Sequence, residues 1–345
     1  MYNEVINKIL EIIDNNSILT EMYPKFPGEG YRAHRIDAKN FYEIKPSNSS
    51  KRIAFVDGGN AEIISSANFS VNLIRVSYVV YQNNKKANSK KFEFLAFVHS
   101  VSKNNEIYYN VSFFNAKNTI ELDEISFSSY DRTLMIGISK ADISSVSNAI
   151  RRFAELKLAK LVADGKKADI IVLDGNLQST LTNEDTYLSG LYESCDKNSV
   201  VFSALSKTTA LFTDNGNLLS AVLANISSIP AWLYYPIADI NSHKHKAEVF
   251  FVRLNKNSKH IFRFEIFNIQ KMKAEETINE LACNCIDPIF MGYPYGLIEA
   301  DKIARVSNQE RESLKTMLLL ELRNKNIEKY LSSVNAHEIL DRVSF

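Results

Sequence analysis

The sequence predicts a mixed α/β fold in which helices flank a central sheet. An apolar run that leads into Asp57-Gly58-Gly59 is typical of a buried strand ending in a tight turn. Residues 71–114 then carry the Val, Ile, Tyr and Phe of an antiparallel sheet. From residue 141 the apolar spacing becomes helical, and strands and helices alternate after it.

Composition sets the broad class of protein. The 345 residues are 45% hydrophobic and 23% charged, which is ordinary for a folded globular chain and excludes disorder as the main state. A net charge of +1 neither indicates nor excludes nucleic-acid binding. The three cysteines are odd in number, which favours a reducing cytoplasm. The chain has neither an export signal nor an apolar run near membrane-spanning length, so we expect no membrane association.

The first part of the chain divides into an arm and the start of the main domain. Residues 1–50 are expected to form an N-terminal helix, at 1–13, followed by an irregular arm rich in Asn, Ser, Pro and Gly. Residues 51–345 form the main domain. It begins with the strand that ends at Asp57 and continues with three strands, whose ranges are 71–81, 92–98 and 106–114. The lysine-rich segment 83–91 is expected to be an exposed turn.

The second part of the chain alternates strands and helices. Ile143, Val146, Ile150 and Phe153 fall at helical spacing, and Asp164-Gly165 ends that helix. Two buried strands follow, at 169–174 and at 200–205. Further strands are expected at 232–235, 247–254 and 260–267, and further helices at 218–226, 273–286, 297–306 and 309–322.

Acidic residues follow two of the predicted strands. Asp57 and Asp174 each stand at a strand end before glycine, where ligands bind in open α/β sheets. Glu155 lies on the helix that leads into the second strand. Converging carboxylates would repel one another, and a hard divalent cation such as Mg²⁺ or Mn²⁺ relieves that repulsion. Taken singly, each Asp-Gly is also a common turn signal, and Glu155 is also an ordinary solvated helix residue.

Four segments together resemble the NurA nuclease family. They are Val56-Asp57-Gly58, Leu173-Asp174-Gly175, Ser206-Lys207-Thr208, and the block Gly-Tyr-Pro-Tyr-Gly-Leu-Ile-Glu-Ala-Asp that ends at Asp301. The resemblance runs from about residue 50 to the end of the chain, and the last block is its most specific part.

The resemblance implies a ribonuclease-H-like core and a homodimer. It implies a manganese-dependent deoxyribonuclease, a 5'-3' exonuclease and single-strand endonuclease that processes DNA double-strand break ends by two-metal phosphodiester hydrolysis. Mg²⁺ is a possible second metal. The DNA would be single-stranded or a double-stranded end, and the partner would be the hexameric HerA translocase, mainly in archaea.

The resemblance also implies roles for individual residues. Asp57, Glu155 and Asp174 match the metal carboxylates, and Tyr293 matches a functional tyrosine. Asp301 stands where the family often has His; as a carboxylate it can still bind a hard metal. Lys207 is placed to reach a phosphate, or else is a surface lysine. Four other acids compete with Glu155 for its role: Glu121, Asp123, Glu124 and Asp131.

Two other functions are open at this point. An actin-like or sugar-kinase-like ATPase shares the core fold, although the late glycines that such enzymes use are sparse here. A non-catalytic adaptor of a ring ATPase would keep the fold and the dimer, and Asp301 is the feature that favours it. The remaining signals are weaker: Cys283 and Cys285 are expected to be semi-buried thiols rather than zinc ligands, and His243 and His245 to lie on a basic surface.

Overall fold

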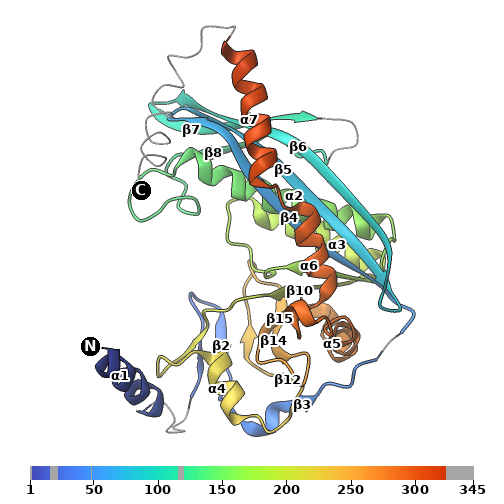
Figure 1. The fold of residues 1–345 in the computed structure, drawn as a ribbon. Coiled ribbons are helices and arrows are strands. Elements are labelled where there is room, and N and C mark those ends of the chain that lie inside the picture. The colour runs from blue at the N-terminus through green and yellow to red at the C-terminus, as the bar shows by residue number, and fades with distance from the viewer. Residues whose placement is uncertain (1, 16–21, 48, 116–119, 324–345) are drawn as a thin grey trace. The chain divides into compact units, whose positions relative to one another are not determined.

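The computed structural model describes residues 2–15, 22–47, 49–115 and 120–323 (Figure 1). The chain divides into two compact units. The Asp57 unit consists of residues 52–171, 179–200 and 296–345, and the Asp174 unit of residues 1–51, 172–178 and 201–295. Each unit combines a β-sheet with helices, so the predicted mixed α/β class is confirmed. The division into an arm and a main domain near residue 50 stays a prediction.

The sheet of the Asp57 unit is antiparallel and follows chain order, as predicted. Its strands are β4 (Arg52–Ser66), β5 (Phe69–Gln82), β6 (Lys85–Lys103), β7 (Glu106–Asn115) and β8 (Ile125–Ser128). The expectation of an exposed turn over residues 83–91 is wrong, because β6 already begins at Lys85. The turn consists of Asn83 and Asn84, with φ of 52° and 55°. Two residues with positive φ match the right-handed twist of a hairpin, and Asn tolerates that conformation.

Strand β4 does not stop at Asp57. It continues through Gly58 and Gly59 to Ser66, so the predicted tight turn there is wrong. The two glycines instead leave room for other elements. A Cβ on Gly58 would lie 2.6 Å from Glu155 Oε1, and a Cβ on Gly59 would lie 2.4 Å from the Ala304 carbonyl oxygen.

Helices cover both faces of this sheet. Successive strand residues point to opposite faces, so Gly58 marks the face of α2 (Val146–Asp164) and Gly59 the face of α6 (Tyr295–Ala304). Helix α3 (Glu184–Lys197) packs against α2, and α7 (Asn308–Arg323) follows α6 (Figure 1). The apolar residues that predicted α2 are buried, and the helix ends at Asp164 before Gly165 as expected.

The leucines of α7 face their own sheet. They pack against Ile63, Ile64 and Leu73, and the leucines concerned are Leu314, Leu318, Leu319 and Leu322. Their apolar pattern is therefore explained by the core of the Asp57 unit. Met317 and Leu320 stay exposed on the same helix.

The Asp174 unit has the strand order β3-β12-β14-β15-β10-β9. The strands are β3 (Phe41–Glu43), β12 (Trp232–Tyr234), β14 (Ala247–Arg253), β15 (Phe262–Phe267), β10 (Val201–Ser206) and β9 (Ile170–Asp174), of which the last three residues belong to this unit. Its helices are α4 (Leu219–Ile226) and α5 (Ala274–Cys283). A core of buried aromatic and aliphatic side chains, including Trp232, Tyr234 and Phe251, holds the unit together.

The N-terminal segment is more regular than expected. Helix α1 (Tyr2–Asn15) confirms the predicted helix. Within the predicted irregular arm, β1 (Pro24–Lys25), β2 (Tyr31–Ala33) and β3 pair with β11 (Phe212–Thr213), β13 (Ala238–Ile240) and β12. These pairings join segments far apart in the chain, which local composition does not reveal. Among the described residues, 3₁₀ helices are formed by Ala38–Asn40, Ile143–Ser145, Asn268–Lys273 and Pro288–Phe290. No helix in the described part of the chain is long and apolar enough to span a membrane.

Gly296 tests the close packing of α6 on β4. A Cβ at this position would lie 2.1 Å from Cδ2 of the buried Phe55 ring. We expect Gly296→Ala to lower the free energy of unfolding by about 1–3 kcal/mol, the usual cost of overpacking a core. Gly190→Ala is the control, because its nearest neighbour would be 3.8 Å away and alanine favours a helix. Urea denaturation measures both; equal stability of the two variants would contradict the packing argument.

Candidate functional site

Three residues predicted from separate motifs meet in the Asp174 unit. Asp174 is the last residue of β9. Lys207 Nζ lies 2.5 Å from Asp174 Oδ2, and the Tyr293 hydroxyl donates to Asp174 Oδ1 over 3.2 Å. Lys207 Nζ also lies 5.5 Å from the centroid of the Tyr293 ring. The carboxylate thus has a cation on one oxygen and a phenol on the other.

Tyr293 combines a buried ring with a hydroxyl that reaches Asp174. Its side chain is fully buried, and its ring stacks on Phe290 and packs against Phe262, with centroid distances of 5.1 and 5.3 Å. The ring is therefore part of the core, while the hydroxyl reaches the acid. Core packing fixes the rotamer and so holds the donor in place.

The end of β10 holds the turn that follows Asp174. Gly175 has φ of 113°, a conformation that glycine adopts without strain. Its amide donates to the Leu205 carbonyl over 3.1 Å, and its own carbonyl accepts from the Ser206 hydroxyl over 2.7 Å. The Ser206-Lys207 pair therefore supplies both an anchor for the turn and a cation for Asp174.

Asp57 occupies the middle of β4 in the other unit. It is buried, with 6% of its surface exposed, and its Oδ1 accepts from the Gly58 amide over 2.7 Å. Asp57 pairs in register with Ser77 of β5, whose hydroxyl donates to the Ala300 carbonyl over 2.9 Å. Directly paired residues share a face of the sheet. Asp57 therefore points to the face that α6 covers, and Asp301 follows Ala300 on that helix.

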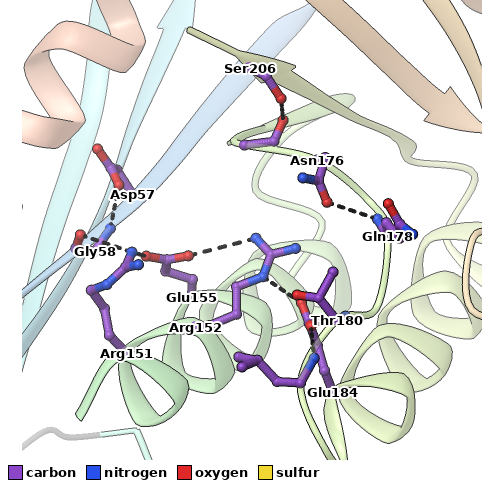
Figure 2. Close-up of polar contacts among 12 residues, drawn as sticks. Asp57, Gly58, Arg151, Arg152, Glu155, Asn176, Gln178, Thr180, Glu184 and Ser206 are labelled. Atoms are coloured by element: carbon purple, nitrogen blue, oxygen red, sulfur yellow. Dashed lines mark hydrogen bonds and ion pairs between the residues drawn. The ribbon is translucent and has the colours of Figure 1, made fainter. Parts of the chain in front are cut away.

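Glu155 approaches Gly58 from the opposite face, on α2. It is buried and lies between two arginines of its own helix, in an ion pair with Arg151 and 3.7 Å from Nη1 of Arg152. Arg151 also donates to the Gly58 carbonyl over 3.4 Å (Figure 2). The cations that buried acids require are thus supplied by α2 itself.

Glu184 fixes the second of these arginines, and the sequence analysis missed it. Arg152 Nε donates to Glu184 Oε1 over 2.8 Å, and Glu184 Oε2 accepts from the amides of Thr180 and Leu181 over 2.8 and 3.0 Å (Figure 2). Burial works against the charge of Arg152, but the carboxylates of Glu184 and Glu155 outweigh it and raise the pKa of Arg152. The one local signal for Glu184 is that it is an acid in the first turn of α3.

The other candidate acids lie in different surroundings. Glu121, Asp123 and Glu124 are exposed, and Asp131 Oδ1 accepts from the Thr133 amide over 2.8 Å in a turn. Asp301 Oδ2 accepts over 2.8 Å from Nη2 of Arg305, the residue that follows the end of α6. Among the acids weighed for the helix position, Glu155 alone is buried.

Two expectations about other polar residues change. His245, expected on a basic surface, is 1% exposed, and it contacts Glu265, which no sequence signal indicated. Cys283 is partly buried, as expected of a semi-buried thiol, but Cys285 is fully buried, and burial raises its pKa well above the usual value.

The donor chemistry of the acids suits a hard divalent cation. Asp57, Glu155 and Asp174 offer carboxylate oxygens, the ligands that Mg²⁺ and Mn²⁺ prefer. Within residues 2–15, 22–47, 49–115 and 120–323, no three His, Cys, Asp or Glu side chains gather in a group that could hold a metal ion. Arg151 and Lys207 pair with two of these acids and balance their negative charge.

Comparisons with known proteins agree with the sequence resemblance. The family model of the NurA domain matches residues 51–306. The structure is similar to that of the NurA nuclease from Sulfolobus solfataricus, with a TM-score of 0.51 and 16% identity over 84% of this chain and 89% of that chain. This likeness supports the fold class.

Endonuclease V structures are less similar. The Ciona intestinalis enzyme, solved with an inosine-containing 24mer DNA, has a TM-score of 0.38 and 12% identity over 77% of this chain and 87% of that chain. The catalytic domain of human Endonuclease V has a TM-score of 0.39 and 11% identity over 82% and 93%. No curated protein matches the sequence. Because the NurA domain covers most of the chain and its motif residues meet at Asp174, the protein belongs to the NurA family.

Proposed function

We propose that this NurA-family chain is a metal-dependent DNA nuclease that hydrolyses phosphodiester bonds. The observation that carries the proposal is the contact of Asp174 with Lys207 and Tyr293, which come from three of the segments that resemble the family. An acid at a strand end beside a lysine and a phenol has the elements that phosphoryl chemistry uses: an oxygen ligand, a cation for phosphate and a hydrogen-bond donor.

The carboxylates that would hold divalent metal in this proposal are Asp57, Glu155, Asp174 and Asp301. Asp57 and Asp301 lie on the α6 side of β4, and Glu155 approaches from the α2 side. When bound, the metal supplies an activated water and stabilises the charge that develops on the leaving oxygen. Mn²⁺ is the expected ion, with Mg²⁺ as a second possibility, since carboxylate donors suit both. The burial of Asp57 supports the assignment, because a buried acid without such a role is costly to the fold, whereas the charge of the buried Glu155 is already balanced by Arg151 and Arg152.

In this proposal Lys207 binds the substrate and Tyr293 positions Asp174. Lys207 Nζ pairs with Asp174 here, and if Asp174 held a cation, the ammonium group could pair with a phosphate oxygen instead. The Tyr293 hydroxyl, held by its buried ring, orients the Asp174 carboxylate and donates to it.

The finer activity that we propose follows the family resemblance. The substrate is DNA, as single strands or double-stranded ends, cut by 5'-3' exonuclease and single-strand endonuclease action in double-strand break processing. The partner is a HerA-type hexameric ATPase of an archaeal cell, and the chain acts as a homodimer in the cytoplasm. Three free thiols agree with a reducing compartment.

The two alternatives carry less support. Family membership favours the nuclease over an actin-like or sugar-kinase-like ATPase. A non-catalytic adaptor would not need the buried acid of β4, the buried acid of α2 and the Asp174 contacts together.

The first prediction concerns the two acids of the strands. We expect Asp57→Ala and Asp174→Ala each to reduce cleavage of linear DNA with Mn²⁺ by about 100-fold or more, because each removes a carboxylate from the reacting centre. Circular dichroism checks that both variants stay folded. Asp185→Ala is the control, since Asp185 is an exposed acid of α3. Near wild-type cleavage by either strand variant would overturn the assignment.

The second prediction concerns Asp301. It lies on the helix that covers the face of Asp57, and the family often has histidine there. We expect Asp301→His to shift the preference toward Mn²⁺ and Asp301→Ala to raise the metal concentration for half-maximal cleavage about tenfold, with little change in DNA binding. Arg305→Ala removes the same ion pair but keeps the carboxylate, so it separates a metal role from a helix contact. If it matches Asp301→Ala, Asp301 is not a ligand.

The third prediction concerns the dimer. Light scattering at micromolar protein is expected to give the mass of two chains. Met317 and Leu320 are the apolar residues of α7 that are left exposed, so Leu320→Glu is expected to lower the dimer fraction if α7 lies at the interface. Ile138→Glu, at an exposed loop position, is the control. A monomeric wild-type chain would remove the dimer from the proposal.

A further inference from the structure

A network of polar contacts around the buried Glu265 adjoins the turn that follows Asp174. Glu265 of β15 is fully buried, and its Oε2 lies 3.0 Å from His245 Nε2. Its Oε1 lies 2.5 Å from Arg263 Nη2. The other ring nitrogen of His245, Nδ1, lies 2.9 Å from the Tyr31 hydroxyl. All four residues belong to the Asp174 unit.

Burial of this carboxylate needs an explanation. Burial alone would raise the pKa of Glu265, yet Arg263, His245 and the amide of Leu177 outweigh it and lower the pKa to about 2. Glu265 is therefore an anion in the middle of a sheet. Apolar residues at buried positions often give a protein as much stability as a buried ion pair does. The stability of the fold therefore does not by itself account for a buried ion pair between Glu265 and Arg263.

The segment after Asp174 is what Glu265 holds. The amide of Leu177 donates to Glu265 Oε2 over 2.7 Å, and Gln178 forms a β-bridge with His245. Leu177 itself is fully buried. Between this anchor and Asp174 stands Gly175, whose φ of 113° marks a backbone position with wide conformational freedom. The end of β10 holds Gly175 itself, and the Leu177 amide adds a second anchor beyond that glycine.

We propose that Glu265 is a positioning residue for Asp174, and that Tyr31 of the N-terminal segment completes the same anchor through His245. The inference rests on the nuclease function proposed above. It adds a series of contacts that runs from Tyr31 in the N-terminal segment to Leu177, three residues after Asp174. In this role Glu265 acts through the Leu177 amide.

The donors and acceptors of the polar network are compatible with a positioning role for Glu265. Burial raises the pKa of Tyr31. Its hydroxyl lies 2.9 Å from His245 Nδ1, and the imidazole tautomer with its proton on Nε2 lets the hydroxyl donate to Nδ1 and Nε2 donate to Glu265. Tyr31 is held in turn by β2 and by stacking on Phe26 at 4.6 Å. Strand β2 thus belongs to the scaffold of the candidate site.

Glu265→Gln tests the proposal in the full-length chain. The variant keeps the shape of the side chain but removes the charge that strengthens the bond to Leu177. We expect hydrogen exchange at the Leu177 amide to speed up about tenfold, and kcat for DNA cleavage to fall about tenfold with KM unchanged within about twofold. Glu248→Gln is the matched control: Glu248 lies on the neighbouring strand β14 and accepts from the Tyr235 hydroxyl over 2.8 Å. It should change neither quantity.

Tyr31→Phe is the second variant, and it leaves the ion pair intact. It is expected to give smaller changes of the same kind, about threefold in each quantity, because it removes a neutral hydrogen bond. Faster exchange at Leu177 together with lower kcat supports the proposal. Unchanged exchange at Leu177 in both variants, or faster exchange with wild-type kcat, overturns it.

The exchange measurement also separates this inference from the proposed function. If Glu265→Gln speeds exchange at Leu177 but the wild-type chain cleaves no DNA, the nuclease proposal fails, and the positioning role fails with it although the anchor exists. If the wild-type chain cleaves DNA and the variant cleaves equally well, the nuclease proposal stands and the positioning role alone is rejected.

Discussion

Pairing of buried acids with cations is the interaction on which both candidate clusters depend. Glu155 lies between Arg151 and Arg152, Asp174 contacts Lys207, and Glu265 contacts Arg263. A carboxylate that leaves water loses several kcal/mol of hydration free energy, which a nearby cation and well-aligned donors must offset. Each pair therefore fixes the position of a side chain as well as its charge. Removal of the cations would leave the buried carboxylates of Glu155 and Glu265 uncompensated.

The need to pair buried acids also explains how the turn before α3 and the turn after β9 are held in place. Glu184 and Glu265 each contact a buried or half-buried arginine with one oxygen and accept from backbone amides with the other. The amides belong to the turn before α3 and to the turn after β9. In both places an acid that is not itself a candidate ligand ties a loop to a helix or strand. Loops next to candidate site residues are thereby given the rigidity of the sheet.

Close approach of helices to β4 is the second requirement, and glycine meets it. Gly58 admits the Glu155 side chain from one face of the sheet, and Gly59 admits the end of α6 from the other. Any side chain at these positions would push the helices away. Helices α2 and α6, which carry Glu155 and Asp301, therefore lie close to the two faces of β4. Asp57 directly precedes the two glycines and follows the buried start of the strand.

What the sequence determined by itself was local. Apolar spacing located α2, β-rich runs located β5 to β7, and short motifs singled out Asp174, Lys207 and Tyr293, which do contact one another. Such features are encoded by neighbouring residues, so a pattern can carry them.

Tertiary structure decided the rest. It extended β4 through two glycines that looked like a turn, buried His245, and gave Glu184 and Glu265 their roles. It also turned part of an irregular-looking arm into strands that pair with distant segments. Each of these outcomes depends on a partner far away in the chain. The free energy of burial, ion pairing or close packing that decides it exists only once that partner is in place, and no local pattern records it.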